Sequence, residues 1–258
     1  MSDARGTALG NPRVHHRRID STNELARELA QRGADHGTLV TASEQTAGRG
    51  RHGREWWSPP GDSLLMSLIL REPPSLLPLA APLAVRDAVL ELADIDPLIK
   101  WPNDIVVADA AGSSLTKLAG ILVEGRPEHD WVVLGIGVNV AVAPSAIPPQ
   151  LRGTVATLGL PRTSVEPLLD ALLRALERRL AEPDELVLEA WRARDALLGR
   201  EIVWVTAAGT PAESSRARAQ GIDGAGRLVV SSGDGSRQAL EAGEIHLAPA
   251  STRERAGA

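Results

Sequence analysis

The apolar positions up to Gly199 alternate between two periods, one typical of strands and one typical of helices. Continuous or alternating apolar runs predict strands at residues 38–43, 63–70, 98–101, 105–108, 118–124 and 131–140. Apolar residues at helical spacing predict helices at 21–31, 79–93, 164–180 and 184–198. A Gly-Arg-Pro turn of the hairpin type separates the last two strands, so we expect a mixed sheet flanked by helices.

The pattern changes after Gly199, where short strands follow one another closely. Strands are predicted at 201–205, 217–222, 228–231 and 238–240, with Gly/Asp turns between them. This spacing predicts a small all-β barrel of about fifty residues. We therefore expect an α+β fold in which residues 1–13 are disordered, 14–198 form the larger domain, 199–248 form the barrel and 249–258 are disordered.

Composition limits the functions that this fold can carry. The 258 residues have a net charge of −5, so the chain lacks the basic excess of a general nucleic-acid coat. The absence of cysteine excludes disulfides, cysteine-ligated metals and thiol catalysis. No signal peptide or membrane span is recognisable, so we expect a cytoplasmic protein. Only Lys100 and Lys117 among the 28 basic residues are lysines, which draws attention to both positions.

A basic loop at residues 48–53 matches the pattern G-x-G-x-x-G. A dinucleotide-binding fingerprint would open a helix, whereas the prolines and glycine at 59–61 forbid one here. The glycines of the 48–53 loop would let backbone amides approach an anion. Arg49, Arg51 and the following Arg54 would add guanidinium groups, and such a loop suits a polyphosphate. The alternative is a solvated surface loop that happens to be basic.

The segment Ser21-Thr22-Asn23-Glu24 has the form of a capping box. In that interpretation the Ser21 side chain bonds the backbone near Glu24, and Glu24 reaches back. The Thr22 and Asn23 side chains at the same helix start could also bind a polar ligand. The two interpretations are compatible, and spacing alone favours the cap.

Lys100-Trp101-Pro102-Asn103-Asp104 crowds a scarce cation, a scarce aromatic residue and a carboxylate around one turn. A type I turn explains the last three residues but neither Lys100 nor Trp101. Trp101 is either ordinary core or a face on which a purine stacks. Asp104 either caps the turn or binds a cation such as Mg²⁺.

Lys117 lies where a buried strand begins, and Gly135 and Gly137 lie inside another strand. Lys117 is either a strand-end charge or a compact ammonium that contacts a carboxylate or phosphate in a crowded place. Alternating glycines weaken a strand unless another group approaches its backbone closely, and that group could be a ligand.

Taken in order along the chain, these motifs resemble those of biotin protein ligases. They are Ser-Thr-Asn, Gln45 followed by Gly-Arg-Gly-Arg-His-Gly, Trp-x-Ser-Pro, Lys-Trp-Pro-Asn-Asp, Lys-Leu-Ala-Gly-Ile-Leu-Val-Glu and Gly-Ile-Gly-Val-Asn. The resemblance implies a class II synthetase-like biotin/lipoate ligase catalytic domain and a C-terminal SH3-like barrel. It also implies that the chain activates biotin with MgATP to biotinyl-5′-AMP, and transfers biotin to one lysine of the carrier domain of carboxylases such as acetyl-CoA carboxylase.

The resemblance also assigns roles to individual residues. The implied catalytic residues are Lys117, Arg49, Arg51 and Asp104, and Asp104 is also the implied metal ligand. The implied biotin contacts are Ser21, Thr22, Asn23, Gln45, Gly48, Arg49, Gly50, Arg51, Lys117, Gly120 and Gly137. The implied ATP contacts are Arg49, Arg51, Arg54, Trp56, Lys100, Trp101, Asn103, Lys117 and Asn139.

Two departures from the family pattern qualify these expectations. About twenty residues precede Ser21, too few for the DNA-binding domain that many members carry, so we expect neither DNA binding nor repression. We expect the chain to be a monomer or a weak homodimer. The connection between Asp104 and Lys117 is longer than usual, which puts their geometry in question. The rival functions are a lipoate or octanoate ligase or transferase of the same fold, and a non-catalytic module that binds biotin or a nucleotide.

Overall fold

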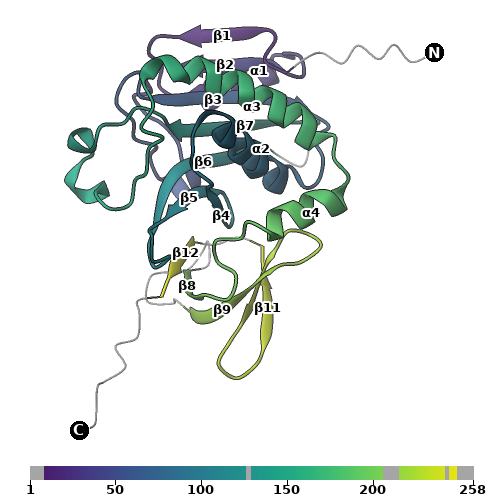
Figure 1. Ribbon diagram of the computed structural model, residues 1–258. Helices are drawn as coiled ribbons and strands as arrows, with labels where there is room; N and C mark the ends of the chain where they lie inside the picture. Colours follow the sequence, from purple (N-terminus) through teal and green to yellow (C-terminus); the bar gives the residue numbers. More distant parts are fainter. Residues whose placement is uncertain (1–8, 126–128, 206–214, 242–243, 249–258) are drawn as a thin grey trace. The chain divides into compact units, whose positions relative to one another are not determined.

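The computed structural model describes residues 9–125, 129–205, 215–241 and 244–248, and Figure 1 traces the chain. The chain separates into two compact units, Met1–Arg194 and Asp195–Ala258. The predicted disordered segments at 1–8 and 249–258 lie outside the described residues, as does most of the Gly-Arg-Pro turn. None of the helices in the described part of the chain is long and apolar enough to cross a membrane.

The first unit is built on a seven-stranded mixed sheet with the order β1-β2-β3-β7-β6-β5-β4. β1 pairs in parallel with β2, and all other neighbours are antiparallel. The strands are β1 Arg13–His16, β2 Leu39–Ala42, β3 Ser63–Arg71, β4 Leu98–Lys100, β5 Asp104–Ala108, β6 Leu115–Gly125 and β7 Trp131–Asn139. The predicted mixed sheet is therefore confirmed.

The start of the chain differs from its prediction, because β1 was not expected and disorder was expected up to residue 13. The Gly10 amide donates to the Gly37 carbonyl at 2.9 Å, and the Leu9 amide donates to Glu177 at 2.9 Å. β1 is short, lies at the sheet edge and is never fully buried, so its sequence shows no apolar run. Its pairing with β2 is a long-range contact that local periodicity does not reveal.

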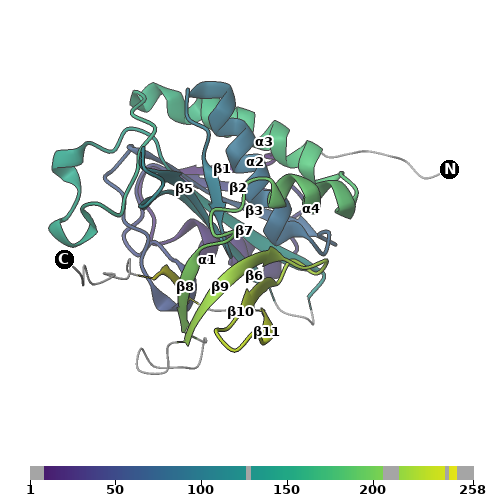
Figure 2. The same cartoon turned by 60° about the horizontal axis from the view of Figure 1, so that its bottom comes forward.

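Helices cover both faces of this sheet. They are α1 Thr22–Gln31, α2 Leu77–Leu92, α3 Val165–Leu180 and α4 Asp184–Arg192, with short 3₁₀ turns at Arg51–Gly53, Pro144–Ala146, Pro149–Leu151 and Arg162–Ser164. α2 and α3 pack side by side over one face (Figures 1 and 2). α1 packs on the other face, where Ala26 and Ala30 meet Val40, Ile69 and Val133.

α4 ends at Arg192, six residues before its predicted end at Leu198. Two contacts explain the early end. The Arg194 carbonyl accepts the Ile99 amide at 2.8 Å, and the Asp195 carboxylate accepts the Leu197 amide at 2.8 Å. In a continuing helix the Arg194 carbonyl and the Leu197 amide would instead bond within the helix ladder.

The second unit is a five-stranded antiparallel sheet with the order β11-β10-β9-β8-β12. Its strands are β8 Glu201–Val205, β9 Ser215–Ile222, β10 Leu228–Ser231, β11 Arg237–Leu240 and β12 Glu244–Leu247. The last of them was not predicted, although its alternation of polar and apolar residues is typical of a strand. The pairings join the strands in a row, so closure into a barrel stays a prediction.

Candidate functional site

The face of the large sheet that α1 covers carries a band of small and polar residues. Ser67 on β3 pairs with Gly135 on β7. Two residues further along β7, Gly137 pairs with Gly120 on β6, and Gly120 pairs in turn with Asp104 on β5. Residues that face each other across a ladder share a face, so these five positions leave a shallow strip without bulky side chains. Three side chains enter the strip.

Asn23, in the first turn of α1, is the first of them. A Cβ atom at Gly135 would collide with its Oδ1, so the glycine makes room for this amide. Oδ1 accepts from the Ser67 hydroxyl at 2.5 Å, and Nδ2 donates to Glu124 Oε2 at 2.8 Å. Asn23 is only 5% exposed, so these bonds stabilise an amide that would be costly to bury alone.

The helix start beside Asn23 is not the predicted capping box. Ser21 occupies the N-cap in extended conformation but makes no capping bond with its side chain, and Glu24 bonds Arg27 and Arg49 instead. Gln45 takes over the cap, because its Oε1 accepts the Thr22 amide at 2.7 Å and the Thr22 hydroxyl at 3.0 Å. The predicted polar group of Ser21, Thr22, Asn23 and Gln45 is therefore brought together.

Trp56 is the second side chain on the strip. A Cβ at Gly137 would lie 2.6 Å from its indole, and one at Gly120 would lie 3.0 Å from it. Close approach at both glycines was predicted, with biotin as the approaching group, whereas in this structure Trp56 takes the space. The indole Nε1 is buried and has no hydrogen-bond partner among the residues that the structure describes, which marks an unused donor on the strip.

Lys117 is the third, and a β-bulge places it there. Val106 pairs with Lys117 and Ile105 with Ala119, so Leu118 is an extra residue in β6. Strict alternation would put Lys117 on the face opposite Gly120, and the bulge returns it to the same face. Its Nζ lies 2.7 Å from Asp104 Oδ1 and 5.7 Å from the centroid of the Trp56 ring.

The longer connection does not disturb this geometry. Its additional residues lie in a turn at 109–114 beyond the ends of β5 and β6, where the Asp109 amide donates to the Ser114 carbonyl at 3.1 Å. The Ser113 amide donates a second hydrogen bond within this turn, to the Asp109 carboxylate at 2.7 Å. The 2.7 Å ion pair between Asp104 and Lys117 lies outside this turn.

Asp104 is surrounded by cations. Lys100 pairs with Asp104 between β4 and β5. Burial lowers the pKa of Lys100, and the Asp104 carboxylate partly offsets this effect. The positive charges of Lys117 and Arg54 lower the pKa of Lys100 further. Burial also lowers the pKa of Arg51, against the opposing effect of Asp104 and together with Arg54. The Asp104 carboxylate is thus paired with Lys117, and its charge also acts on Lys100 and Arg51, on both of which the Arg54 charge acts as well. Positive charges outnumber the one carboxylate, an arrangement that favours an added anion.

The predicted metal role of Asp104 has limited support from these surroundings. No group of three or more His, Asp or Glu residues that could hold an ion occurs in the described ranges. The single carboxylate is already paired with Lys117, so the donor set does not fit a resident cation. Mg²⁺ would have to arrive already bound to phosphate oxygens, as it does with ATP.

The basic loop at 48–56 folds back on itself. The Trp56 amide donates to the Gly48 carbonyl at 3.0 Å, and the Gly50 amide donates to the Arg54 carbonyl at 2.7 Å. A Cβ at Gly48 would collide with the Trp56 carbonyl, so this glycine serves the fold of the loop. The expectation that loop glycines offer their amides to an anion therefore does not hold for Gly50.

Arg49 is held by two carboxylates. Nη1 donates to Glu24 Oε2 at 2.7 Å, and Nη2 lies 3.3 Å from Glu124 Oε1. Glu124 was not among the predicted site residues, and neither was Ser67. Ser67 had a detectable signal, because it is the only polar residue inside the apolar run at 64–70 and is fully buried.

Three of the predicted ATP contacts are engaged in the fold. Trp101 is only 3% exposed, and Asn103 Nδ2 donates to the Ile121 carbonyl at 2.8 Å. Asn139 Nδ2 donates to the Ala156 carbonyl at 3.0 Å, and its Oδ1 accepts from Ser63 at 3.3 Å. These contacts tie the strands around Lys117 together, and an adenine contact by any of the three stays a prediction.

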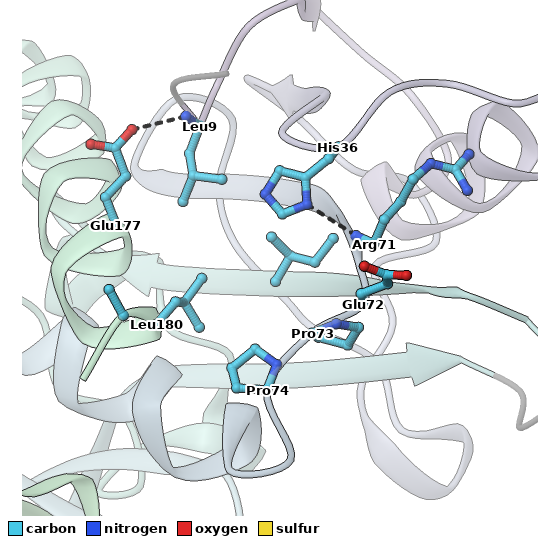
Figure 3. Close-up of a pocket in the computed structure, with 10 residues that line it drawn as sticks. Leu9, His36, Arg71, Glu72, Pro73, Pro74, Glu177 and Leu180 are labelled. Atoms are coloured by element: carbon cyan, nitrogen blue, oxygen red, sulfur yellow. Dashed lines mark hydrogen bonds between the residues drawn. The ribbon is translucent and has the colours of Figure 1, made fainter. Parts of the chain in front are cut away.

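A separate cavity of about 530 Å³ lies at the far end of β3, beside the last turn of α3 (Figure 3). The His36 ring accepts the Arg71 amide there at 3.1 Å, and Glu177 accepts the Leu9 amide. None of the predicted site residues lines this cavity.

Comparison with known proteins identifies the family to which the chain belongs. Residues 15–140 match the model of the biotin/lipoate A/B protein ligase family, and 204–247 match the biotin protein ligase C terminal domain. The bifunctional ligase/repressor BirA of Bacillus subtilis is 41% identical over 159 residues, which cover 58% of this chain and 47% of that protein. The chain thus spans about half the length of the first curated relatives it matches.

Two further comparisons cover nearly the whole of both chains. The biotin--[acetyl-CoA-carboxylase] ligase of Paracoccus denitrificans is 37% identical over 246 residues, covering 88% of this chain and 97% of that protein. The structure of the Aquifex aeolicus biotin protein ligase in complex with biotin and ATP has a TM-score of 0.72 and 25% identity, covering 92% and 99% of the two chains. With its motifs on one face of the expected mixed sheet, the chain belongs to the biotin protein ligases of the biotin/lipoate A/B protein ligase family.

Proposed function

We propose that this chain is an ATP-dependent biotin ligase that modifies a lysine in the carrier domain of a carboxylase. One observation carries the proposal: the buried polar group of Ser21, Thr22, Asn23 and Gln45, called the amide pocket below, and the Lys117–Asp104 ion pair lie along the same strip of one sheet face, and the Asp104 charge also acts on Lys100 and Arg51. A reaction between a carboxylate with a polar head group and a polyphosphate needs both features. The complex of the Aquifex aeolicus relative with biotin and ATP supports the choice of ligands.

In the first step a biotin carboxylate oxygen attacks the α-phosphorus of ATP. A mixed anhydride bond forms, the bond to the β-phosphate oxygen breaks, and pyrophosphate leaves. Both reactants are anions, so the site must neutralise charge before they can approach. Lys117 suits the central position, because its ammonium keeps further N–H donors after pairing with Asp104.

The other cations suit the phosphates. Arg51, Arg54 and Lys100 surround Asp104 and would bind the phosphate oxygens of the MgATP substrate, with Mg²⁺ contributing charge neutralisation when it enters. In the second step the carrier lysine amine attacks the anhydride carbonyl, an amide bond forms and AMP leaves. Asp104 lies where it could accept the proton of that amine.

The amide pocket suits the ureido group of biotin. Asn23, Thr22 and Gln45 combine donors and acceptors in a small volume, and Ser21 adds a buried hydroxyl group beside them. A lipoyl or octanoyl chain would need an apolar tunnel at this position. Burying these polar groups against a hydrocarbon chain would cost free energy, so the pocket chemistry favours biotin.

The exchange of labelled pyrophosphate into ATP tests the proposal. We expect exchange that depends on biotin and is not supported by lipoate or octanoate, because only adenylate formation is reversible in this way. Folded protein that binds biotin but catalyses no exchange would identify a binding module. Exchange with lipoate but not biotin would identify the rival ligase.

The lowered pKa of Lys100 predicts a pH dependence for ATP binding. Burial disfavours its charged form, so the ammonium loses its proton at a lower pH than an exposed lysine does. The KM for ATP should therefore rise with pH already below the range in which an exposed lysine loses its proton. In Lys100→Arg the guanidinium stays charged, so the KM should vary less with pH. Equal pH profiles in both proteins would exclude Lys100 from phosphate binding.

A further inference from the structure

Glu124, on β6, contacts two parts of the site that are far apart in the sequence. Its Oε2 accepts a hydrogen bond from Asn23 Nδ2 at 2.8 Å, and its Oε1 lies 3.3 Å from Arg49 Nη2. The side chain is 25% exposed, and it stands opposite Val133 on the face that α1 covers. One carboxylate thus joins the amide pocket to the basic loop.

The contact with Asn23 determines which way that amide faces. An ionised carboxylate can only accept hydrogen bonds, so Asn23 must turn its Nδ2 towards Glu124 and its Oδ1 towards the Ser67 hydroxyl. Each end of the amide keeps one unused position, an N–H on Nδ2 and a lone pair on Oδ1. Glu124 therefore sets where the pocket donates and where it accepts.

The contact with Arg49 is shared with a second carboxylate. Arg49 donates from Nη1 to Glu24 and lies with Nη2 beside Glu124, so its guanidinium bridges helix α1 and strand β6. Glu24 is also paired with Arg27. Arg49 consequently keeps one carboxylate partner when Glu124 is neutralised, whereas Asn23 loses the carboxylate to which its Nδ2 donates.

We propose that Glu124 is a positioning residue for biotin, acting through Asn23. It orients the Asn23 amide so that its free N–H and its free lone pair match the acceptor and donor of a ureido group. The inference rests on the proposed function, because it names the residue that gives the amide pocket its polarity. Glu124 itself need not touch the ligand.

The variant Glu124→Gln tests this orientation with little change in shape. A glutamine can turn an N–H towards Asn23, which lets the Asn23 amide rotate and exchange its donor and acceptor ends. We expect the Kd for biotin, measured by titration calorimetry, to rise at least about tenfold. The KM for ATP in pyrophosphate exchange should change less than about twofold in this variant. Glu28 is an exposed carboxylate on α1, and the control Glu28→Gln should change neither the Kd for biotin nor the KM for ATP by more than about twofold.

A double variant separates orientation from stability. In Asn23→Asp with Glu124→Gln the glutamine donates to the new carboxylate, so the hydrogen bond between the two positions is restored with its direction reversed. The melting temperature should return towards that of the unmodified chain, but biotin affinity should not, because residue 23 now offers only acceptors to the ligand. If Glu124→Gln does not fold, the double variant alone decides.

Each remaining outcome has a defined meaning. Unchanged biotin affinity in Glu124→Gln overturns the inference, and so does recovery of both stability and affinity in the double variant, which would make Glu124 purely structural. If the unmodified chain itself does not bind biotin in the same titration, the proposed function fails first. The two failures are therefore distinguishable within one experiment.

Discussion

Lys117→Ala should reduce biotin-dependent pyrophosphate exchange by about 100- to 1,000-fold, the usual cost of removing a charge that stabilises a transition state. The fold should survive, because Lys117 is 38% exposed on its side chain and its backbone bonds to Thr154 and Ala156 remain. The loss should appear in kcat with a smaller change in the Kd for biotin. Single-turnover adenylate formation checks this, with the melting temperature as a measure of folding.

Lys117→Arg should not restore the rate. The Lys117 Nζ lies between the Asp104 carboxylate, the Gly120 backbone and the Trp56 ring, and a planar guanidinium is larger than the ammonium it would replace. Arg32→Ala, an exposed cation at the end of α1, is the matched control and should leave exchange unchanged. Full activity in Lys117→Arg would show that any cation at this strand position suffices.

Gly135→Ala should raise the Kd for biotin by about tenfold to a hundredfold, because the new Cβ occupies the place of Asn23 Oδ1. Asn23 would have to leave its bonds with Ser67 and Glu124. Overpacking should also lower the free energy of unfolding by about 1–3 kcal/mol. Titration calorimetry and chemical denaturation measure the two effects separately.

A second substitution tests whether the loss of stability in Gly135→Ala comes from the collision of the new Cβ with Asn23. In Gly135→Ala with Asn23→Ser the shorter side chain clears the new methyl group, so stability should recover while biotin affinity stays low. Gly224→Ala is the matched control, because a Cβ there meets nothing within 4 Å. If Gly135→Ala binds biotin as tightly as the unmodified chain, Asn23 does not contact the ligand.

Local periodicity predicts the elements that pack on a large apolar surface. The strand at 63–70 was predicted to be buried on both sides, and β3 has that burial because α1 packs on one face of the sheet and α2 with α3 on the other. The helix at 164–180 was also predicted correctly to within one residue, since α3 spans Val165–Leu180. β1 was missed, because it carries no apolar run and depends on its partner β2. β12 was missed although its residues alternate as those of a strand do.

The structure brings the predicted residues Thr22, Asn23 and Gln45 together, whereas Ser67 and Glu124 beside them were not predicted, and a binding role for any of these residues stays a prediction. Sequence spacing favours a capping box at Ser21, yet tertiary contacts give Glu24 to Arg49 and the cap to Gln45. The glycines at 120 and 137 indicate a close approach, and no local pattern says that the approaching group is Trp56. Glu124 belongs to a recognised motif, but its two contacts depend on pairing between distant segments.

The bulge at Leu118 also separates two parts of the hairpin that can then vary independently. The turn at 109–114 lies beyond the paired ends of β5 and β6, whereas the face on which Lys117 lies is fixed by the one extra residue next to it. Residues gained or lost at the tip would leave the Lys117 ammonium on the same face of the sheet. A single deletion beside the bulge would rotate that ammonium through the sheet to the face covered by α2 and α3. Descendants of this chain can therefore change the length of the hairpin without losing its chemistry, provided that the irregularity in β6 is inherited intact.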